Sequence, residues 1–173
     1  ISELESLITD KTRIVALSHV QFCSGFTADL KKLGDLCKKK GVDLVIDAAQ
    51  SLGCLKLYPE DYNISAVVAS GWKWLMGPVG ASVMYTTADF RKKIEPTMAG
   101  PELMKHHGLS YLDHRWRPQE DGRMFEFGTM PLSLAIGLEA AVKENSLKYG
   151  IEEIEKEVFR LQDIFLAEID RDK

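Results

Sequence analysis

The chain has 173 residues, of which 45% are hydrophobic and 28% are charged, and its net charge is −4. This composition is typical of a globular domain that buries one sizeable core. The sequence has no basic stripe, so we expect neither nucleic acid nor a membrane surface as a partner. No apolar run approaches the roughly 20 residues of a membrane span, which favours a cytoplasmic protein.

The cysteines and histidines do not indicate a metal site. The three cysteines are far apart in sequence and odd in number, which is typical of reduced thiols. They are Cys23, Cys37 and Cys54. The histidines His106, His107 and His114 lack the spacing of helical zinc ligands, so we expect them at the surface.

The first half of the chain alternates helical and extended patterns. Apolar residues at helical spacing predict a helix within residues 1–9, and a short β-branched run predicts a strand over 13–18. A second helix is predicted over 27–40, where a lysine cluster precedes Gly41. Three further buried strands are predicted, over residues 42–48, 64–69 and 80–85.

The order of these elements predicts an α/β fold with three layers (α/β/α), in which helices cover a mostly parallel sheet. Residues 99–123 are rich in glycine, proline, histidine and charge without a clear period, which predicts a long surface excursion. A helical pattern resumes over 132–143. After Gly150, a last helix carries apolar residues at nearly heptad spacing, opposite a glutamate-rich face that we expect in solvent.

Two isolated charges carry the functional prediction. Lys73 is the only charged residue across 63–87, and Asp47 is the only one across 44–55. An ammonium in such an apolar setting is costly to desolvate, and a lysine that gives up its proton there can form a Schiff base. Asp47 and Ser70 fall at the carboxyl ends of predicted strands, where ligands of parallel sheets collect. The isolated acid and lysine together predict a pyridoxal phosphate site.

Each of these residues alone has a simpler explanation. An aspartate at a strand end, such as Asp47, often caps a helix or a turn. Lys73 lies between Trp72 and Trp74, so it could make a cation–π contact instead. Gln50 is uninformative by itself. The conjunction of all of them in this order favours the cofactor site.

Several motifs resemble those of the class V aminotransferase group of fold-type I pyridoxal phosphate enzymes, which includes the cysteine desulfurases. Residues 47–53 (Asp-Ala-Ala-Gln-Ser-Leu-Gly) resemble that group's Asp-x-x-Gln segment. Residues 70–73 (Ser-Gly-Trp-Lys) are similar to its Ser-Gly-His-Lys, and residues 77–80 (Gly-Pro-Val-Gly) to its Gly-Pro-x-Gly. Further matches lie at residues 18–20, at Gly25 and at residues 125–129, so the resemblance covers most of the chain.

The resemblance implies a role for each candidate residue. Asp47 would keep the pyridine nitrogen protonated, and Gln50 would donate to the phenolic oxygen. Lys73 would form the Schiff base and then move protons, and Ser70 would bind the phosphate. Thr129 would reach the phosphate of a neighbouring subunit across a two-fold interface, which implies a homodimer. Thr129 alone is also well placed to cap the helix predicted after it.

The resemblance also implies a domain organisation and two candidate functions. Residues 1–149 would form part of the large cofactor domain, and 150–173 a helix leading toward a small domain that this chain lacks. We expect the chain alone to bind pyridoxal phosphate weakly or not at all and to be inactive. The first candidate is an enzyme acting on a small amino acid by desulfuration, transamination or epimerisation. The second is a remnant without cofactor that serves as a scaffold or interaction module.

Two residues depart from the desulfurase pattern. Trp72 stands where the family carries a histidine, and Phe22 stands where desulfurases usually carry an asparagine. None of the three cysteines occupies the place of the desulfurase nucleophile. The reaction branch therefore stays open among the three chemistries.

Overall fold

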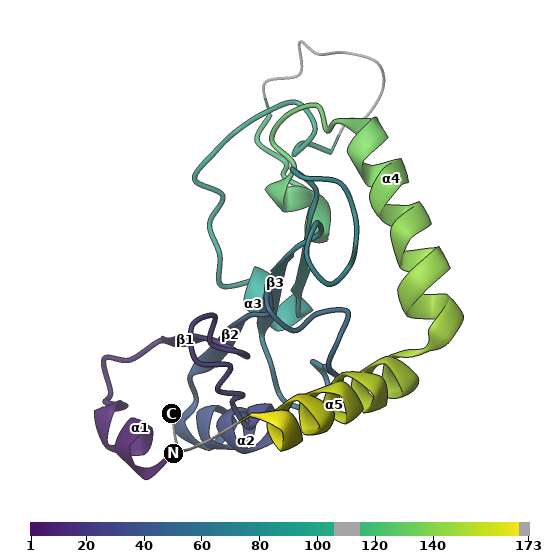
Figure 1. Ribbon diagram of the computed structural model, residues 1–173. Coiled ribbons are helices and arrows are strands. Elements are labelled where there is room, and N and C mark those ends of the chain that lie inside the picture. Colours follow the sequence, from purple (N-terminus) through teal and green to yellow (C-terminus); the bar gives the residue numbers. More distant parts are fainter. Residues whose placement is uncertain (106–114, 170–173) are drawn as a thin grey trace.

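The computed structural model describes residues 1–105 and 115–169. Its strands are β1 (Ile14–Ser18), β2 (Asp43–Asp47), β3 (Ala66–Ser70) and β4 (Ser82–Thr86). They form one sheet in the order β1-β2-β3-β4 (Figure 1). The first three strands are parallel, and β4 pairs with β3 antiparallel. The predicted α/β class with a mostly parallel sheet is therefore confirmed.

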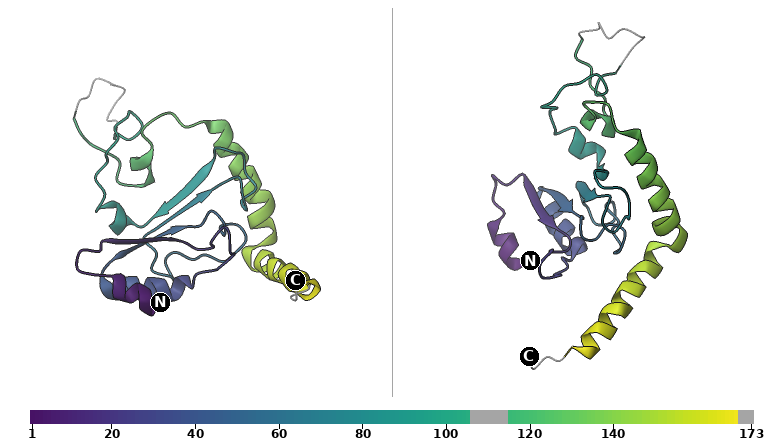
Figure 2. Two further views of the ribbon diagram at one scale, coloured as in Figure 1. Left: turned by 60° about the vertical axis from the view of Figure 1, so that its left-hand side comes forward. Right: turned by 45° about the horizontal axis from the view of Figure 1, so that its top comes forward.

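The helices lie on two sides of this sheet. They are α1 (Ser2–Leu7), α2 (Leu30–Lys40), α3 (Ala88–Arg91), α4 (Leu132–Val142) and α5 (Ile151–Glu168), with a 3₁₀ turn at Gly122–Phe125 and a π-helix at Lys143–Leu147. In Figures 1 and 2, α1 and α2 lie together on one side of the sheet, and α4 and α5 form an arc along another. Among the described residues, no helix is long and apolar enough to cross a membrane.

The central strand β2 explains why one face of the sheet is buried. Leu44 and Ile46 are fully buried, and they pack in the main core with Leu33 and Cys37 of α2. Because side chains alternate along a strand, the same register turns Asp47 to the opposite face. The core therefore fixes the side of the sheet on which the candidate acid lies.

The face that carries Asp47 is open in the part of the chain that the structure describes. Val68 of β3 is paired with Asp47 on one side and with Met84 of β4 on the other. The exposed fractions are 37% for Val68 and 47% for Met84, and Ile14 at the start of β1 is 49% exposed. These three side chains are thus partly exposed on the face that carries Asp47.

Capping explains the bounds of α2. The helix was predicted from residue 27, but it begins at Leu30 because the Asp29 carboxylate accepts a hydrogen bond from the backbone N of Lys32 (3.0 Å). It ends after Lys40, where Gly41 adopts a left-handed conformation with φ of 68°. The glycine after the lysine cluster therefore ends the helix as predicted.

The last two helices are nearly continuous. α4 was predicted over 132–143, and its path continues through the π-helix to Gly150, which has φ of 79°. α5 is then tied to the body of the chain by polar contacts. The Lys56 backbone N donates to Glu155 Oε2 (2.7 Å), and the Tyr58 hydroxyl donates to Glu152 Oε1 (2.7 Å). These bonds hold the helix beside the turn that follows β2.

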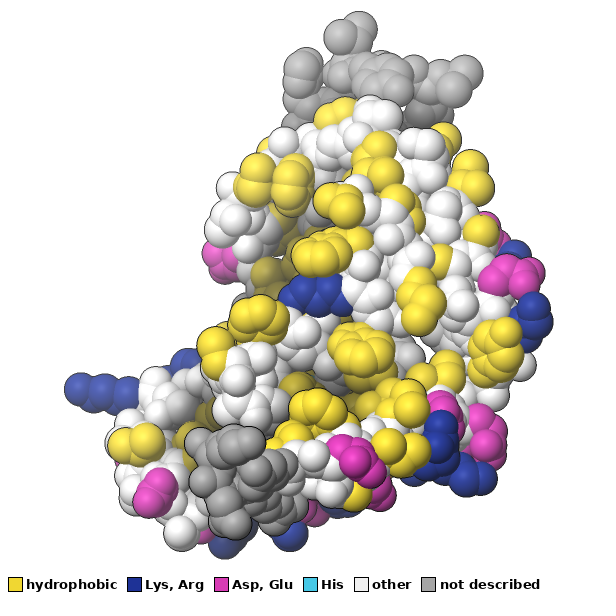
Figure 3. All heavy atoms as spheres, in the orientation of Figure 1, with side chains coloured by type: hydrophobic (Ala, Val, Ile, Leu, Met, Phe, Trp, Pro, Cys, Tyr) yellow, Lys and Arg dark blue, Asp and Glu magenta, His cyan; other side chains and the backbone are white. Residues whose placement is uncertain are grey.

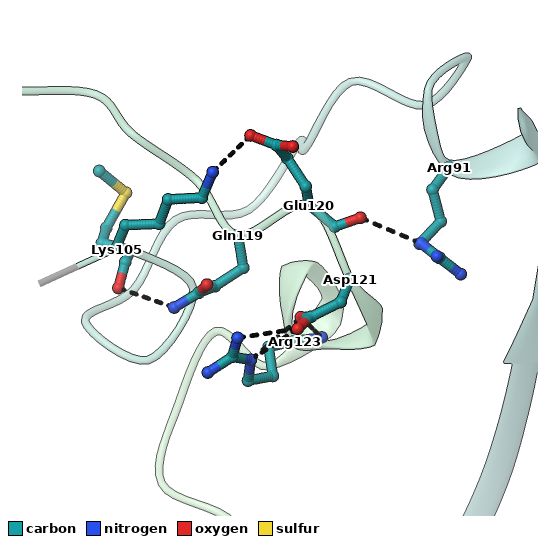
Figure 4. A network of polar contacts seen from close by, with 7 residues as sticks. Arg91, Lys105, Gln119, Glu120, Asp121 and Arg123 are labelled. Atoms are coloured by element: carbon teal, nitrogen blue, oxygen red, sulfur yellow. Dashed lines mark hydrogen bonds and ion pairs between the residues drawn. The ribbon is translucent and has the colours of Figure 1, made fainter. Parts of the chain in front are cut away.

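The described part of the 99–123 excursion is held by the polar network of Figure 4. Arg91 of α3 donates through Nε to the Glu120 carbonyl (3.1 Å), and the Lys105 ammonium pairs with the Glu120 carboxylate. Arg123 binds the Asp121 carboxylate, with its Nη2 2.8 Å from Oδ2. These side-chain contacts act together with backbone hydrogen bonds, such as that from the Gln119 backbone N to the Leu103 carbonyl (2.8 Å), to hold this segment.

Candidate active site

Asp47 and Ser70 lie at the same edge of the sheet, at the carboxyl ends of β2 and β3. Asp47 is exposed, and its Oδ1 accepts a hydrogen bond from the backbone N of Ala49 (2.8 Å). Asp47 therefore does stabilise a turn, which is the simpler explanation considered from the sequence. This hydrogen bond uses only Oδ1, and Oδ2 has no hydrogen-bond partner among the described residues. Asp47 can thus keep its hydrogen bond within the turn through Oδ1 and still accept a hydrogen bond from a ligand through Oδ2.

Lys73 is presented on a turn that hydrogen bonds close tightly. The backbone N of Gly71 donates to the Ala81 carbonyl (2.8 Å), and that of Gly77 donates to the Gly71 carbonyl (2.8 Å). Within the turn, the N of Met76 donates to the Lys73 carbonyl (2.9 Å). The backbone that carries the candidate amine is therefore fixed by its own hydrogen bonds.

The Lys73 ammonium lies near two aromatic rings. Its Nζ is 5.6 Å from the centroid of the Trp72 ring and 5.8 Å from that of Phe22. The cation–π contact considered from the sequence thus exists, but its partners are Trp72 and Phe22 rather than Trp74. Sequence reasoning missed the Phe22 contact, because the ring comes from the distant loop after β1. Among the described residues, no carboxylate lies within ion-pair distance of Lys73.

A glycine brings the turn after Asp47 against the turn of Lys73. Gly53 has φ of 102°, and a Cβ added to it would lie 2.6 Å from the Trp74 carbonyl oxygen. Only a residue without a side chain permits this approach of two backbones. The two motifs that flank the candidate site therefore touch each other directly.

We expect Gly53→Ala to lower the free energy of unfolding by at least about 2 kcal/mol, because alanine adds a steric clash to an unfavourable backbone conformation. Urea unfolding monitored by circular dichroism measures this loss. Gly122→Ala serves as the control, since a Cβ there meets nothing within 4 Å. Equal stability of the Gly53 and Gly122 variants would contradict the close contact of the two turns.

Two buried polar atoms at this edge lack partners among the described residues, and they are Ser70 Oγ and His19 Nδ1. An unpaired buried hydroxyl is costly, and a ligand oxygen would relieve that cost at Ser70. His19 directly follows β1, and its backbone N donates to the Asp47 carbonyl (2.9 Å). Burial lowers the pKa of His19, against an opposing effect of the Glu155 carboxylate. His19 belongs to the matched motif at residues 18–20, and the sequence alone indicates no role for it.

We expect the free energy of unfolding to decrease as pH falls below about 6.5, because the unfolded chain binds a proton at His19 that the folded chain resists. The loss should approach about 1.4 kcal/mol per pH unit and stop at the lowered pKa of the folded state. Denaturant unfolding between about pH 7 and pH 5.5, above the main carboxylate range, measures this slope. His19→Gln should be flatter in that range, and identical slopes in both proteins would refute the prediction.

The side chains of Gln50 and Thr129 make fewer contacts with the rest of the site than those of the other candidates. Gln50 is half-buried in the turn after Asp47, and its side chain makes no hydrogen bond to a described residue. Thr129 is exposed, and no hydrogen bond joins it to Asp47 or Lys73. The capping explanation for Thr129 is wrong, because the cap of α4 is Pro131 and makes no side-chain bond.

The donor set suits an organic ligand better than a metal. The described residues contain no group of three metal-ligating side chains. His106, His107 and His114 lie outside the described residues. At the sheet edge the chain offers an amine, a carboxylate with a free oxygen, and an unpaired hydroxyl. These groups fit a ligand with an aldehyde, a basic ring nitrogen and a phosphate.

Comparison with known proteins gives a consistent set of similarities. The sequence model of the aminotransferase class-V family matches residues 1–172. A probable cysteine desulfurase of Halalkalibacterium halodurans is 33% identical over 156 residues, which are 90% of this chain and 37% of that protein. The chain thus spans little more than a third of the length of such curated relatives.

Solved structures show the same likeness. The apo cysteine desulfurase of Thermococcus onnurineus NA1 superposes with a TM-score of 0.79 at 28% identity, covering 90% of this chain and 38% of that one. A variant of C-DES with glycine covalently linked to its pyridoxal phosphate cofactor gives a TM-score of 0.80 at 26% identity, with 90% and 40% covered.

Proposed function

Because the chain belongs to the aminotransferase class-V family, we propose that it carries the cofactor site of a pyridoxal phosphate enzyme acting on a small amino acid. Lys73 would hold the cofactor as a Schiff base. The observation that supports the proposal is the contact between the turn after Asp47 and the turn of Lys73, at the sheet edge where the Ser70 hydroxyl is buried without a partner among the described residues. Bound pyridoxal phosphate supplies an electron sink for cleavage of a bond at the substrate's α-carbon.

The chain's own residues have distinct tasks in this proposal. Asp47, through its free Oδ2, would keep a proton on the ring nitrogen. Gln50 would donate its amide to the ring oxygen, and Ser70 would donate its hydroxyl to a phosphate oxygen. Lys73, once displaced by the substrate amine, would act as the base that moves a proton at the α-carbon.

The substrate is the least defined part of the proposal. The relatives are cysteine desulfurases by name, and a solved neighbour is described as a cystine C-S lyase bound to cysteine persulfide. We therefore assign a small amino acid, with desulfuration, transamination and epimerisation all open. A panel of amino acids assayed with the full-length protein for sulfide, keto acid and loss of chirality separates the three. Failure of every assay, with cofactor bound, would refute the proposed activity.

The open sheet face around Val68 and Met84 supports a second candidate, an interaction module without cofactor. Absorbance distinguishes the two, because a Schiff base of pyridoxal phosphate is yellow. A colourless full-length protein that stays colourless with added cofactor would favour the module. Seen from the side of Figure 3, hydrophobic side chains gather over the middle of the molecule, and most charged ones lie toward its rim.

We also propose that the enzyme is a homodimer in which Thr129 binds the phosphate of the neighbouring subunit. The exposure of Thr129 and its lack of a capping role support this assignment. The division into a partial large domain at 1–149 and a helix from 150 onward belongs to the same proposal. So does a cytoplasmic location, which fits the three free cysteines.

We expect the 173-residue chain alone to have no turnover and weak cofactor binding, because the open face leaves the site in contact with water. Size-exclusion chromatography with light scattering, run beside a cofactor titration, tests both the assembly and the binding. A monomer that takes up one pyridoxal phosphate per chain would overturn the role of Thr129 and this expectation together.

A further inference from the structure

Phe22 and Trp72 reach Lys73 from two separate segments that are each closed by hydrogen bonds. Phe22 lies in the loop after β1, which Gln21 closes with two hydrogen bonds. The Gln21 side-chain oxygen accepts a hydrogen bond from the backbone N of Cys23 (2.6 Å), and the Gln21 backbone N donates one to the Phe26 carbonyl (2.9 Å). Trp72 lies in the turn that is closed by the backbone hydrogen bonds of Gly71 and Gly77. Both rings therefore belong to segments whose backbone conformation is fixed by hydrogen bonds.

The two rings have little other packing. Phe22 is 77% exposed and Trp72 is 50% exposed, so neither contributes a buried side chain to the core. Their shared neighbour is the Lys73 ammonium, at 5.8 and 5.6 Å from the ring centroids. Both distances lie within the range of about 6 Å over which a ring face attracts a cation. The rings thus bracket the one amine to which the proposed chemistry assigns the cofactor.

We propose that Phe22 and Trp72 form an aromatic clamp that positions the Lys73 amine at the sheet edge. The inference rests on the proposed function for its purpose, but the clamp is a property of the chain itself. A lysine side chain has a flexible four-carbon stem, and attraction to two ring faces restricts where its end lies. The clamp residues act through Lys73, so they are positioning residues.

Trp74 offers a matched control. It lies on the same turn as Trp72 and is similarly exposed at 41%, but it makes no cation–π contact with a lysine among the described residues. Trp74→Leu therefore removes an indole from the same turn without touching the clamp. Trp72→Phe keeps a ring at the clamp and should rescue what Trp72→Leu loses.

The first measurement uses ¹³C-formaldehyde and cyanoborohydride, which convert lysine amines to dimethylamines that stay positively charged. Each amine nitrogen attacks the aldehyde carbon, water leaves, and the reagent's hydride reduces the imine. The methyl resonance of Lys73, identified by its absence in Lys73→Arg, should be displaced upfield by the two rings. Trp72→Leu and Phe22→Leu should each reduce this displacement, and Trp74→Leu should leave it unchanged. A resonance that neither clamp variant moves would overturn the clamp.

The second measurement uses pyridoxal phosphate followed by borohydride, with Lys92 as an internal reference because its side chain is 75% exposed. The ratio of modification at Lys73 to that at Lys92 should rise about fivefold in Trp72→Leu, because one cation–π contact stabilises the ammonium and only the neutral amine reacts with the aldehyde. An unchanged or decreased ratio would refute the contact between the ring and the amine. If unmutated Lys73 takes up no pyridoxyl group while its methyl resonance is still displaced, the proposed function fails and the clamp stands.

Discussion

Lys73→Arg is expected to reduce turnover of the full-length protein to background, because a guanidinium stays protonated and cannot form a Schiff base. The variant keeps a positive charge between the Trp72 and Phe22 rings, so the fold should survive. Turnover and the yellow absorbance should disappear together, while circular dichroism stays unchanged. These three signals on the purified protein test the assignment.

Lys93→Arg provides the control for this experiment. Lys93 pairs with Asp43 at the opposite end of β2, with its Nζ 2.8 Å from Oδ2, and arginine can keep that ion pair. The control should retain both colour and turnover. Residual yellow colour in Lys73→Arg would mean that another lysine holds the cofactor.

Asp47→Asn is expected to lower turnover on the order of a thousandfold or more, because an amide cannot hold a proton on the pyridine nitrogen. The substitution preserves the turn, since the Asn carbonyl can accept the hydrogen bond from the Ala49 backbone that Asp47 now accepts. Cofactor should therefore remain bound. Steady-state kinetics, together with the absorbance of bound cofactor, measure the two effects separately.

Asp43→Asn is the matched control, because Asp43 lies on the same strand and the same sheet face but at the other edge. It should lose its ion pair with Lys93 and keep its turnover. Unchanged activity in Asp47→Asn would show that the Asp47 side chain only stabilises the turn that follows β2.

The parts of the fold with a local cause were predictable from the sequence. Short apolar runs marked all four strands, and Gly41 marked the end of α2, because burial and backbone conformation select those residue types directly. Isolation of charge singled out Asp47 and Lys73. The structure places their two turns in contact, although their cofactor roles stay predictions.

Features set by distant contacts were not predictable. Nothing in the sequence around Phe22 indicates that its ring approaches Lys73, since the contact depends on how β1 and β3 are placed in the sheet. The unpaired Ser70 hydroxyl likewise appears only once the packing around it is known. The continuation of α4 into a π-helix has no clear composition signal, because every residue there is compatible with an α-helix.

Borohydride reduction of the full-length protein with pyridoxal phosphate, followed by peptide mass mapping, identifies the lysine that binds the cofactor. Reduction makes the bond between amine and cofactor permanent, so the modified residue identifies itself by mass. We predict a phosphopyridoxyl group on Lys73 in stoichiometric amount, and none in Lys73→Arg. A stoichiometric adduct on any other lysine, with Lys73 unmodified, would show that Lys73 does not hold the cofactor.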